Sequence, residues 1–246
     1  MNSKFLFLFL FVLFVIGAAA IHIISRKKER SQKINAWKKF FVYFFVIYSI
    51  FLSIVYVPVL FRAICFLVAL GGGFEIVRLQ RKSHQRLAWG KFCLYFSLYI
   101  AFAVGFCFFA FDESVEMEIQ ILTVLAVCTF DAFSQLCGQL FGKRKIAPRI
   151  SPNKTLGGLV GGTLSALILG VIANFNSGFG IIGVIILILF VITASFVGDL
   201  LASYIKRQYA VKDYGSLLPG HGGILDRFDS LIVAGSVMFL LKFICL

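Results

Sequence analysis

The most constraining feature of the chain is a series of apolar runs long enough to cross a lipid bilayer. A transmembrane helix needs about 20 predominantly apolar residues, and several runs here approach or exceed that length. The mean hydropathy of +0.96 and the 30 Phe residues exclude a soluble globular domain. Backbone groups in lipid must be satisfied within the segment, and the runs are too continuously apolar for barrel strands. The sequence therefore predicts an all-α, polytopic membrane protein.

We predict eight transmembrane helices within a single membrane-embedded domain, residues 1–246. The predicted spans are 5–24, 39–57, 58–77, 89–111, 119–141, 155–174, 178–202 and 228–246. The run 39–77 is divided because Pro58 and Arg62 indicate a tight turn within it. The first span is expected to remain as an anchor, although residues 17–20 resemble a signal-peptide cleavage site. Export would carry the four basic residues of 26–30 across the membrane.

The 24 Lys and Arg residues are concentrated in four loops, which sets the orientation of the chain. Seven lie in 25–39, five in 78–91, five in 143–154 and four in 206–227. With eight spans these loops share one side, and the intervening loops are short or, at 112–118, acidic. The positive-inside rule therefore places the basic side in the cytoplasm and both termini outside. Topology and anionic lipid head groups account for much of the formal charge of +13, and no nucleic-acid partner is expected.

A charged segment, residues 203–229, lies between the last two apolar runs and is the predicted active site. Asp199, Ser203 and Lys206 fall at i, i+4 and i+7, so they share one face of the penultimate helix. Asp226 and Asp229 share a face at the start of the last helix, where carboxylates are favoured. Hard oxygen ligands of this kind can gather a divalent cation. The alternative is that Asp226 only caps the helix while Arg227 pairs locally.

A second cluster runs from Asp131 to the glycines at 157–162. Asp131 is an acid well inside a predicted span, which indicates function, although an ion pair or a helix-packing hydrogen bond is the alternative. The segment 151–155, S-P-N-K-T, is typical of a helix start in which Ser or Asn caps the helix and Lys154 faces an anion. The glycines at 157, 158, 161 and 162 permit close helix packing.

Two motifs resemble those of a known enzyme family. The chain has S-x-x-K-R-x-x-x-x-K-D at 203–213, followed by P-G-H-G-G-I-L-D-R-F-D at 219–229. This pair resembles the signature of the phosphatidate cytidylyltransferases, and S-P-N-K-T is similar to their second block, so that the resemblance covers about 131–232. It implies transfer of a cytidylyl group from CTP to phosphatidate, giving CDP-diacylglycerol and pyrophosphate. It also implies Mg²⁺ at Asp199 and Asp226, with K⁺ as a second ion.

The expected site residues follow from the two clusters and this resemblance. The metal ligands are Asp199, Asp226 and Asp229; the catalytic residues are Lys206, Arg207, Lys212, Asp213, His221 and Arg227; the substrate-binding residues are Asp131, Ser151, Asn153, Lys154, Thr155, Ser203, Gly222 and Gly223. A phosphate monoester is already anionic near neutral pH, so the lipid nucleophile needs no general base. The basic residues would neutralise the phosphates of CTP. His221 would orient a phosphate oxygen or protonate pyrophosphate; the alternative is a purely conformational role among its glycine neighbours.

Several alternatives concern the substrate and the class of protein. Many relatives have Glu at the positions of Gly157 and Ala202, and a Tyr-containing sequence at 134–135, which leaves the acceptor lipid open. Another lipid phosphate or a polyprenol is the rival acceptor, and an ion transporter or channel is the rival class. The D-G-x-x-A-R pattern of CDP-alcohol phosphotransferases is absent. The expected location is the bacterial inner (plasma) membrane, with the site at the cytoplasmic face; a homodimer is a further open expectation.

Overall fold

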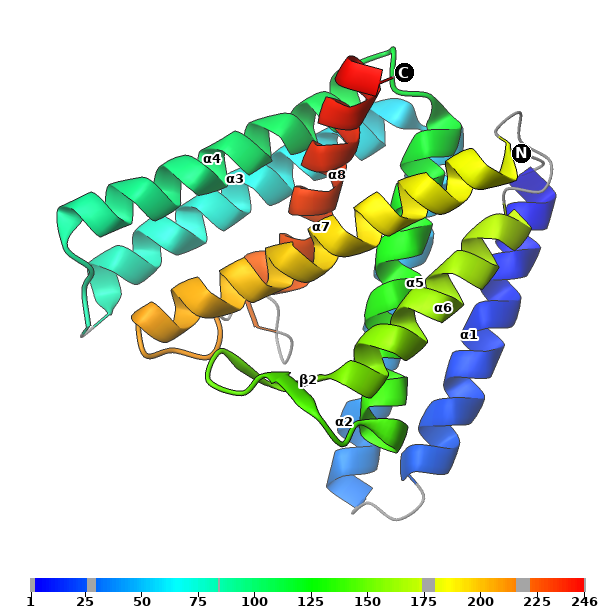
Figure 1. Ribbon diagram of the computed structural model, residues 1–246, viewed down its shortest axis with the longest axis horizontal. Helices are drawn as coiled ribbons and strands as arrows, with labels where there is room; N and C mark the ends of the chain where they lie inside the picture. Colours follow the sequence, from blue (N-terminus) through cyan, green and yellow to red (C-terminus); the bar gives the residue numbers. More distant parts are fainter. Residues whose placement is uncertain (1–2, 26–29, 84, 174–179, 216–221, 246) are drawn as a thin grey trace.

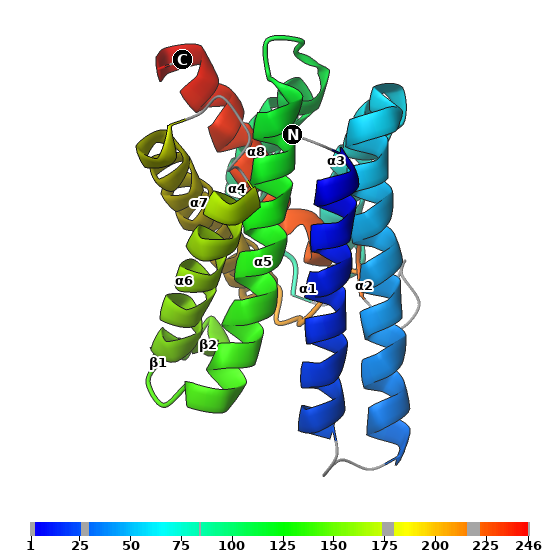
Figure 2. The ribbon, with the colours of Figure 1, turned by 90° about the vertical axis from the view of Figure 1, so that its right-hand side faces the viewer.

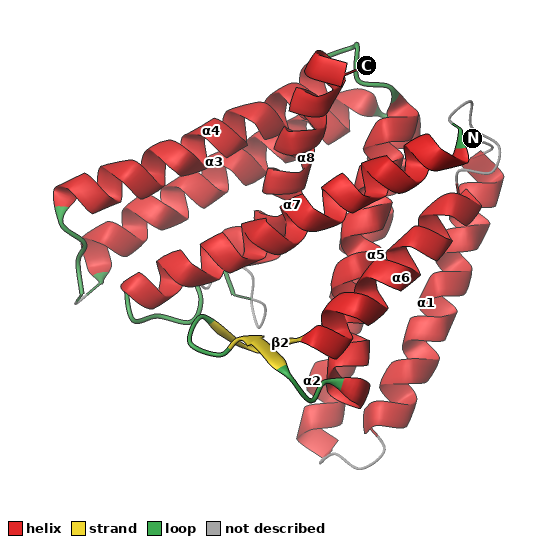
Figure 3. Ribbon diagram, viewed as in Figure 1, coloured by secondary structure: helices red, strands yellow, loops and turns green. Residues whose placement is uncertain are grey.

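The computed structural model describes residues 3–25, 30–83, 85–173, 180–215 and 222–245, which form eight helices and one small β-hairpin (Figures 1 and 3). The helices are α1 Ser3–Ser25, α2 Arg30–Tyr56, α3 Pro58–Lys82, α4 Trp89–Phe111, α5 Met117–Phe141, α6 Leu156–Ala173, α7 Ile181–Gln208 and α8 Leu225–Cys245. The strands are β1 Lys145–Ala147 and β2 Ser151–Thr155. The predicted all-α class is confirmed, and each helix overlaps one predicted span.

Seven of the described helices, α1 to α7, are long and apolar enough to cross a membrane. The eighth predicted span corresponds to α8, which has 21 residues and begins with a charged first turn. The division at Pro58 is confirmed: α2 ends at Tyr56, and Pro58 occupies the first turn of α3. Proline is tolerated there because the first N–H groups of a helix have no intrahelical acceptor.

The predicted helix start at residues 151–155 is wrong, because these residues form strand β2. This strand pairs antiparallel with β1, in a register that places Lys145 opposite Thr155. The helix begins one residue later, at Leu156, and its cap is Thr155 rather than Ser or Asn. The Thr155 hydroxyl accepts a hydrogen bond from the Gly158 amide at 3.1 Å, which satisfies one of the amides left free at a helix start.

Close packing of α5 on α6 depends on glycine, as the sequence predicts. A Cβ atom at Gly158 would lie 2.6 Å from the Ser134 carbonyl oxygen, and one at Gly161 would lie 2.5 Å from the Cys137 side chain. Side chains larger than hydrogen would therefore push the two helices apart. This packing holds β2, which precedes α6, against the helix that contains Asp131.

The two termini lie at the same end of the molecule, opposite the β-hairpin (Figures 1 and 2). At that end the acidic loop between α4 and α5 meets two basic side chains outside the four basic loops. Arg62 lies 3.8 Å from Glu113, and Lys242 lies 3.8 Å from Glu116. The arrangement of the described helices agrees with the predicted topology, in which the acidic loop and the termini share one side.

Candidate active site

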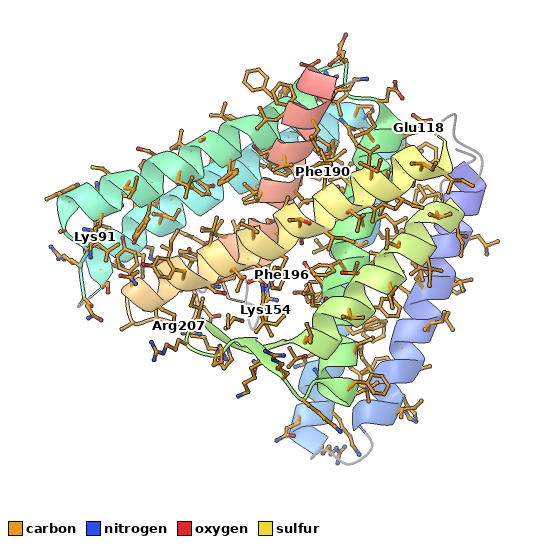
Figure 4. All side chains as sticks on the ribbon, in the orientation of Figure 1. Lys91, Glu118, Lys154, Phe190, Phe196 and Arg207 are labelled. Atoms are coloured by element: carbon orange, nitrogen blue, oxygen red, sulfur yellow. The ribbon has the colours of Figure 1, made fainter. Side chains whose placement is uncertain are left out.

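The first element of the site is an ion pair between the hairpin and α7. Lys154 Nζ, at the end of β2, lies 2.8 Å from Asp199 Oδ2. The same ammonium donates to the Phe196 carbonyl oxygen at 3.4 Å and lies 4.5 Å from the centre of the Phe196 ring. Both residues are labelled in Figure 4. Asp199 also accepts a hydrogen bond from the Ser203 hydroxyl at 3.2 Å, which confirms that these two residues share a face of α7. Lys154 is therefore fixed beside a carboxylate that is still partly exposed.

A second ion pair joins α7 to α8. Lys206 Nζ lies 2.8 Å from Asp226 Oδ1, and both side chains are nearly buried. The other oxygen of Asp226 accepts from the Tyr214 amide at 2.8 Å and from the Gly223 amide at 2.9 Å. Asp226 thus pairs with a cation and also orders the loop before α8.

Asp131 and Asp229 complete the group of acids. Asp131, on α5, is exposed although it lies inside a membrane span, and its carboxylate interacts electrostatically with Asp199, Asp229 and Lys154. Asp229, on α8, is buried and also interacts with Asp199 and Lys206. Four acids and two lysines from α5, β2, α7 and α8 therefore act on one another. Such a concentration of charge is costly among apolar helices unless the charges bind one another or a charged substrate.

Gly222 and Gly223 lie in the loop before α8, where its backbone approaches Asp226 and the other acids. Gly222 has φ of +89°, a left-handed conformation that glycine adopts without strain. A Cβ atom at Gly222 would lie 3.3 Å from Asp226 Oδ2, so the backbone passes close to the acid. His221, predicted to act between these glycines, lies outside the described residues.

Several predicted site residues have other roles or lie at the edge of the group. Arg207 donates to two backbone carbonyls, those of Ile150 at 3.2 Å and Val211 at 2.9 Å, and so ties α7 to the hairpin. Arg227 donates to the Tyr43 hydroxyl and lies 5.6 Å from the centre of that ring. Four other predicted site residues lie at the surface or near it: Asn153, Lys212 and Asp213 are exposed, and Ser151 is half-buried.

Tyr214 forms one wall of the group and was not predicted. Burial, together with the nearby carboxylates of Asp229 and Asp226, raises the pKa of its hydroxyl well above the ordinary value. The hydroxyl therefore stays protonated, and it donates to the Ala202 carbonyl oxygen at 3.0 Å. The Lys206 ammonium lies 5.3 Å from the centre of the Tyr214 ring, an arrangement that favours the cation.

Glu75, on α3, is a second residue that the sequence analysis missed. Its side chain is fully buried, and its two oxygens accept from the amides of Ile224 and Leu225, each at 2.9 Å. An acid inside a predicted span was the signal that singled out Asp131, and Glu75 gives the same signal within the predicted span 58–77.

A mainly apolar cavity lies between α3, α4, α7 and α8, next to the charged group. Its walls include Ile76, Tyr99, Ala202 and Val233, and Asp229 lies in the wall nearest the acids. Ala202 thus lines this apolar space and presents no side-chain ligand.

Apolar helices around a cluster of opposed acids and lysines define the class of the molecule, a polytopic membrane protein. The pattern of one known family, the cytidylyltransferase family, matches residues 1–245. The chain belongs to the cytidylyltransferase family.

Individual relatives agree with this membership. A phosphatidate cytidylyltransferase of Rickettsia bellii is 30% identical over 232 residues, which cover 89% of this chain and 98% of the relative. Enzymes of the same name from Staphylococcus haemolyticus and Bacillus subtilis are 39% and 38% identical, over 57% of this chain and 54% and 55% of their own lengths. The family match extends the resemblance well beyond 131–232, into the amino-terminal helices.

Proposed function

We propose that the protein is a phosphatidate cytidylyltransferase, which transfers CMP from CTP to phosphatidate. The observation that supports this most directly is the pair of lysine–aspartate contacts, Lys154–Asp199 and Lys206–Asp226, within a member of the cytidylyltransferase family. A site for two phosphate-bearing substrates needs cations to neutralise them, together with a means of holding those cations in place before the substrates arrive. The two aspartates hold the two ammonium groups in this way.

The reaction is a displacement at the α-phosphorus of CTP. A phosphatidate oxygen forms the new bond to this phosphorus while the bond to the bridging oxygen breaks, and pyrophosphate leaves with the electron pair. The nucleophile is already an anion because the second pKa of a phosphate monoester is about 6. Catalysis would then rest on orientation and charge neutralisation, which we assign to Lys154 and Lys206, the two lysines held by the aspartates.

We propose that the site also holds magnesium. Among the described residues, no three His, Cys, Asp or Glu side chains form a ready-made metal cage. Asp199 and Asp226 each contact a cationic nitrogen at 2.8 Å, and hard carboxylate oxygens of this kind are the ligands Mg²⁺ prefers, usually with substrate phosphates completing the shell. We propose that Asp199 and Asp226 hold it, with Asp229 beside them; bound there, Mg²⁺ would neutralise charge on the CTP phosphates.

We propose that the site faces the cytoplasm and that the lipid enters it sideways. The basic loops support this orientation through the positive-inside rule. The apolar cavity beside Asp229, between α3, α4, α7 and α8, is where we expect the lipid tails next to the phosphate to lie. A water-soluble nucleotide and a membrane lipid can then meet at Asp199 and Asp226.

The proposal is tested by incubating purified protein in detergent with labelled CTP, Mg²⁺ and a panel of lipid phosphates. We expect CDP-diacylglycerol from phosphatidate, one pyrophosphate per lipid product, and no turnover without a divalent cation. Diacylglycerol should be inert, because its neutral hydroxyl would need a general base, whereas the phosphate monoester of phosphatidate is already an anion. The panel includes polyprenyl phosphate as the rival acceptor.

Other products would contradict the proposal in distinguishable ways. Release of CDP with a newly phosphorylated lipid would identify a CTP-dependent kinase. Turnover with polyprenyl phosphate alone would replace the acceptor and leave the nucleotide chemistry standing. No turnover with any lipid phosphate would favour a membrane protein that does not catalyse this reaction.

A further inference from the structure

We propose that Glu75 is a positioning residue for the active site, one that sets the place of Asp226 through the backbone of the loop before α8. The inference rests on the proposed function, because Asp226 is assigned there as a ligand of the nucleotide-bound cation. Glu75 lies on α3, about 150 residues away in sequence, and touches neither substrate nor metal in this assignment.

The geometry is that of a helix cap supplied from outside the helix. Helix α8 begins at Leu225 and is preceded by Ile224, an apolar residue that cannot cap the helix with its own side chain. The two oxygens of Glu75 accept from the Ile224 and Leu225 amides, each at 2.9 Å. The negative charge of Glu75 therefore lies at the amino-terminal end of α8, where the helix dipole favours it.

Asp226 follows directly in the chain and holds the neighbouring amide. Its Oδ2 accepts from Gly223 at 2.9 Å, so two carboxylates bind three successive amides, those of residues 223, 224 and 225. Glu75 anchors this turn to α3, and Asp226 anchors it to Lys206 on α7. Without Glu75, the turn would keep its link to α7 through Asp226 and Lys206 but lose its link to α3.

The close approach of the loop indicates that Glu75 and the glycines fit one another. A Cβ atom at Gly223 would lie 2.5 Å from one Glu75 oxygen, and a Cβ atom at Gly215 would lie 2.8 Å from the other. Both glycines therefore allow the loop to reach a fully buried carboxylate. The absence of a side chain at both positions leaves the two Glu75 oxygens free to accept hydrogen bonds from the backbone of the loop.

The test compares Glu75→Gln, Glu75→Asp and Glu75→Ala in the full chain. Gln keeps the shape but offers one acceptor oxygen to two amides, Asp keeps the charge on a shorter side chain, and Ala removes both. The matched control is Glu113→Gln, an acid whose side chain is 88% exposed in the loop between α4 and α5. Three quantities are measured: the rate of cytidylyl transfer against Mg²⁺ concentration, hydrogen exchange of the amides of 222–230, and the thermal unfolding midpoint.

We expect Glu75→Gln to lower kcat about ten-fold or more and to raise the Mg²⁺ concentration needed for half the maximal rate. Exchange should rise at residues 223–226 and stay unchanged in α3 and α7. Glu75→Asp should recover part of the rate, and Glu113→Gln should match the unmodified protein. This pattern separates a displaced ligand from general destabilisation, which would raise exchange in all the helices.

Three results would overturn the inference. They are a rate for Glu75→Gln equal to that of the unmodified protein, a lost rate with unchanged exchange at 223–226, and a lost rate with exchange raised equally throughout. If the unmodified protein transfers no cytidylyl group, the proposed function fails separately. Exchange then decides alone: local release in Glu75→Ala supports the anchor, and unchanged exchange contradicts it.

Discussion

At the scale of single residues, the two aspartates of the lysine pairs differ in what else they hold. Asp199 contacts side chains, Lys154 and Ser203, in addition to any ligand it binds. Asp226 also accepts from two backbone amides, those of Tyr214 and Gly223. The side chain of Asp199 is 35% exposed and that of Asp226 is 4% exposed. The same chemical change should therefore have different structural consequences at the two positions.

We expect Asp199→Asn and Asp226→Asn each to reduce turnover about a thousand-fold, because each removes a charged ligand from the transition state. Only Asp226→Asn should also lower the unfolding temperature clearly, since it leaves Lys206 buried without its charge partner. Turnover and thermal unfolding are measured in detergent, with Asp112→Asn in the loop between α4 and α5 as the control. Near-normal turnover of either mutant at limiting Mg²⁺ would remove that residue from the site.

The sequence predicted the acids and lysines of the site because their spacing on helices is visible in one dimension. Asp199 with Ser203, and Asp226 with Asp229, follow from helical periodicity alone. The partners of Lys206 and Lys154 could not be predicted, because they are set by how α7 packs against α8 and the hairpin. Glu75 is the clearest case: its partners are backbone amides, which have no sequence signature.

At the scale of elements, the junction between the hairpin and α6 shows how tertiary pairing decides between two local outcomes. The segment S-P-N-K-T contains several residues that can cap a helix, so the sequence alone favoured a cap at Ser or Asn. Pairing with β1 keeps these residues extended up to Thr155, and the hydroxyl of Thr155 then becomes the cap. The eight helices themselves were predictable because long apolar runs have no other stable form in lipid.

Replacement of Thr155 by Val should destabilise the protein by about 1 kcal/mol, because the Gly158 amide loses its acceptor at the start of α6. The measurement is the shift in thermal unfolding in detergent. Thr193→Val is the control, since that hydroxyl bonds within α7 to the Leu189 carbonyl and caps no helix. Equal shifts in the two variants would show that the Thr155 cap contributes no more to stability than a hydroxyl bonded within a helix.

At the scale of the whole molecule, the distribution of charge and the arrangement of helices agree. The basic loops predicted one cytoplasmic side, and the structure places both termini and the acidic loop 112–116 at the end opposite the hairpin. Arg62 and Lys242 pair with that acidic loop, which accounts for two bases outside the four basic loops. Charge counting could give this topology without any knowledge of packing.

In a variant whose native cysteines are replaced, a cysteine at Arg149 should react only from the cytoplasmic side, and one at Ser114 only from outside. Both positions are exposed, one in the hairpin turn and one in the acidic loop. The measurement is labelling with a membrane-impermeant reagent before and after the cells are opened. Labelling of both positions from the same side would contradict the eight-span topology.

The length of α7 gives the proposed reaction a consequence for the two leaflets. Asp199 lies about 27 Å along the helix from Ile181, close to the roughly 30 Å thickness of the hydrocarbon core. An upright α7 that starts at the outer edge of the core would bring Asp199 close to the inner edge, next to the inner head groups. A lipid can react there without its tails leaving the inner leaflet. We expect the nucleotide-bearing lipid to accumulate on the inner leaflet alone, so that any copy found on the outer leaflet requires a separate flippase.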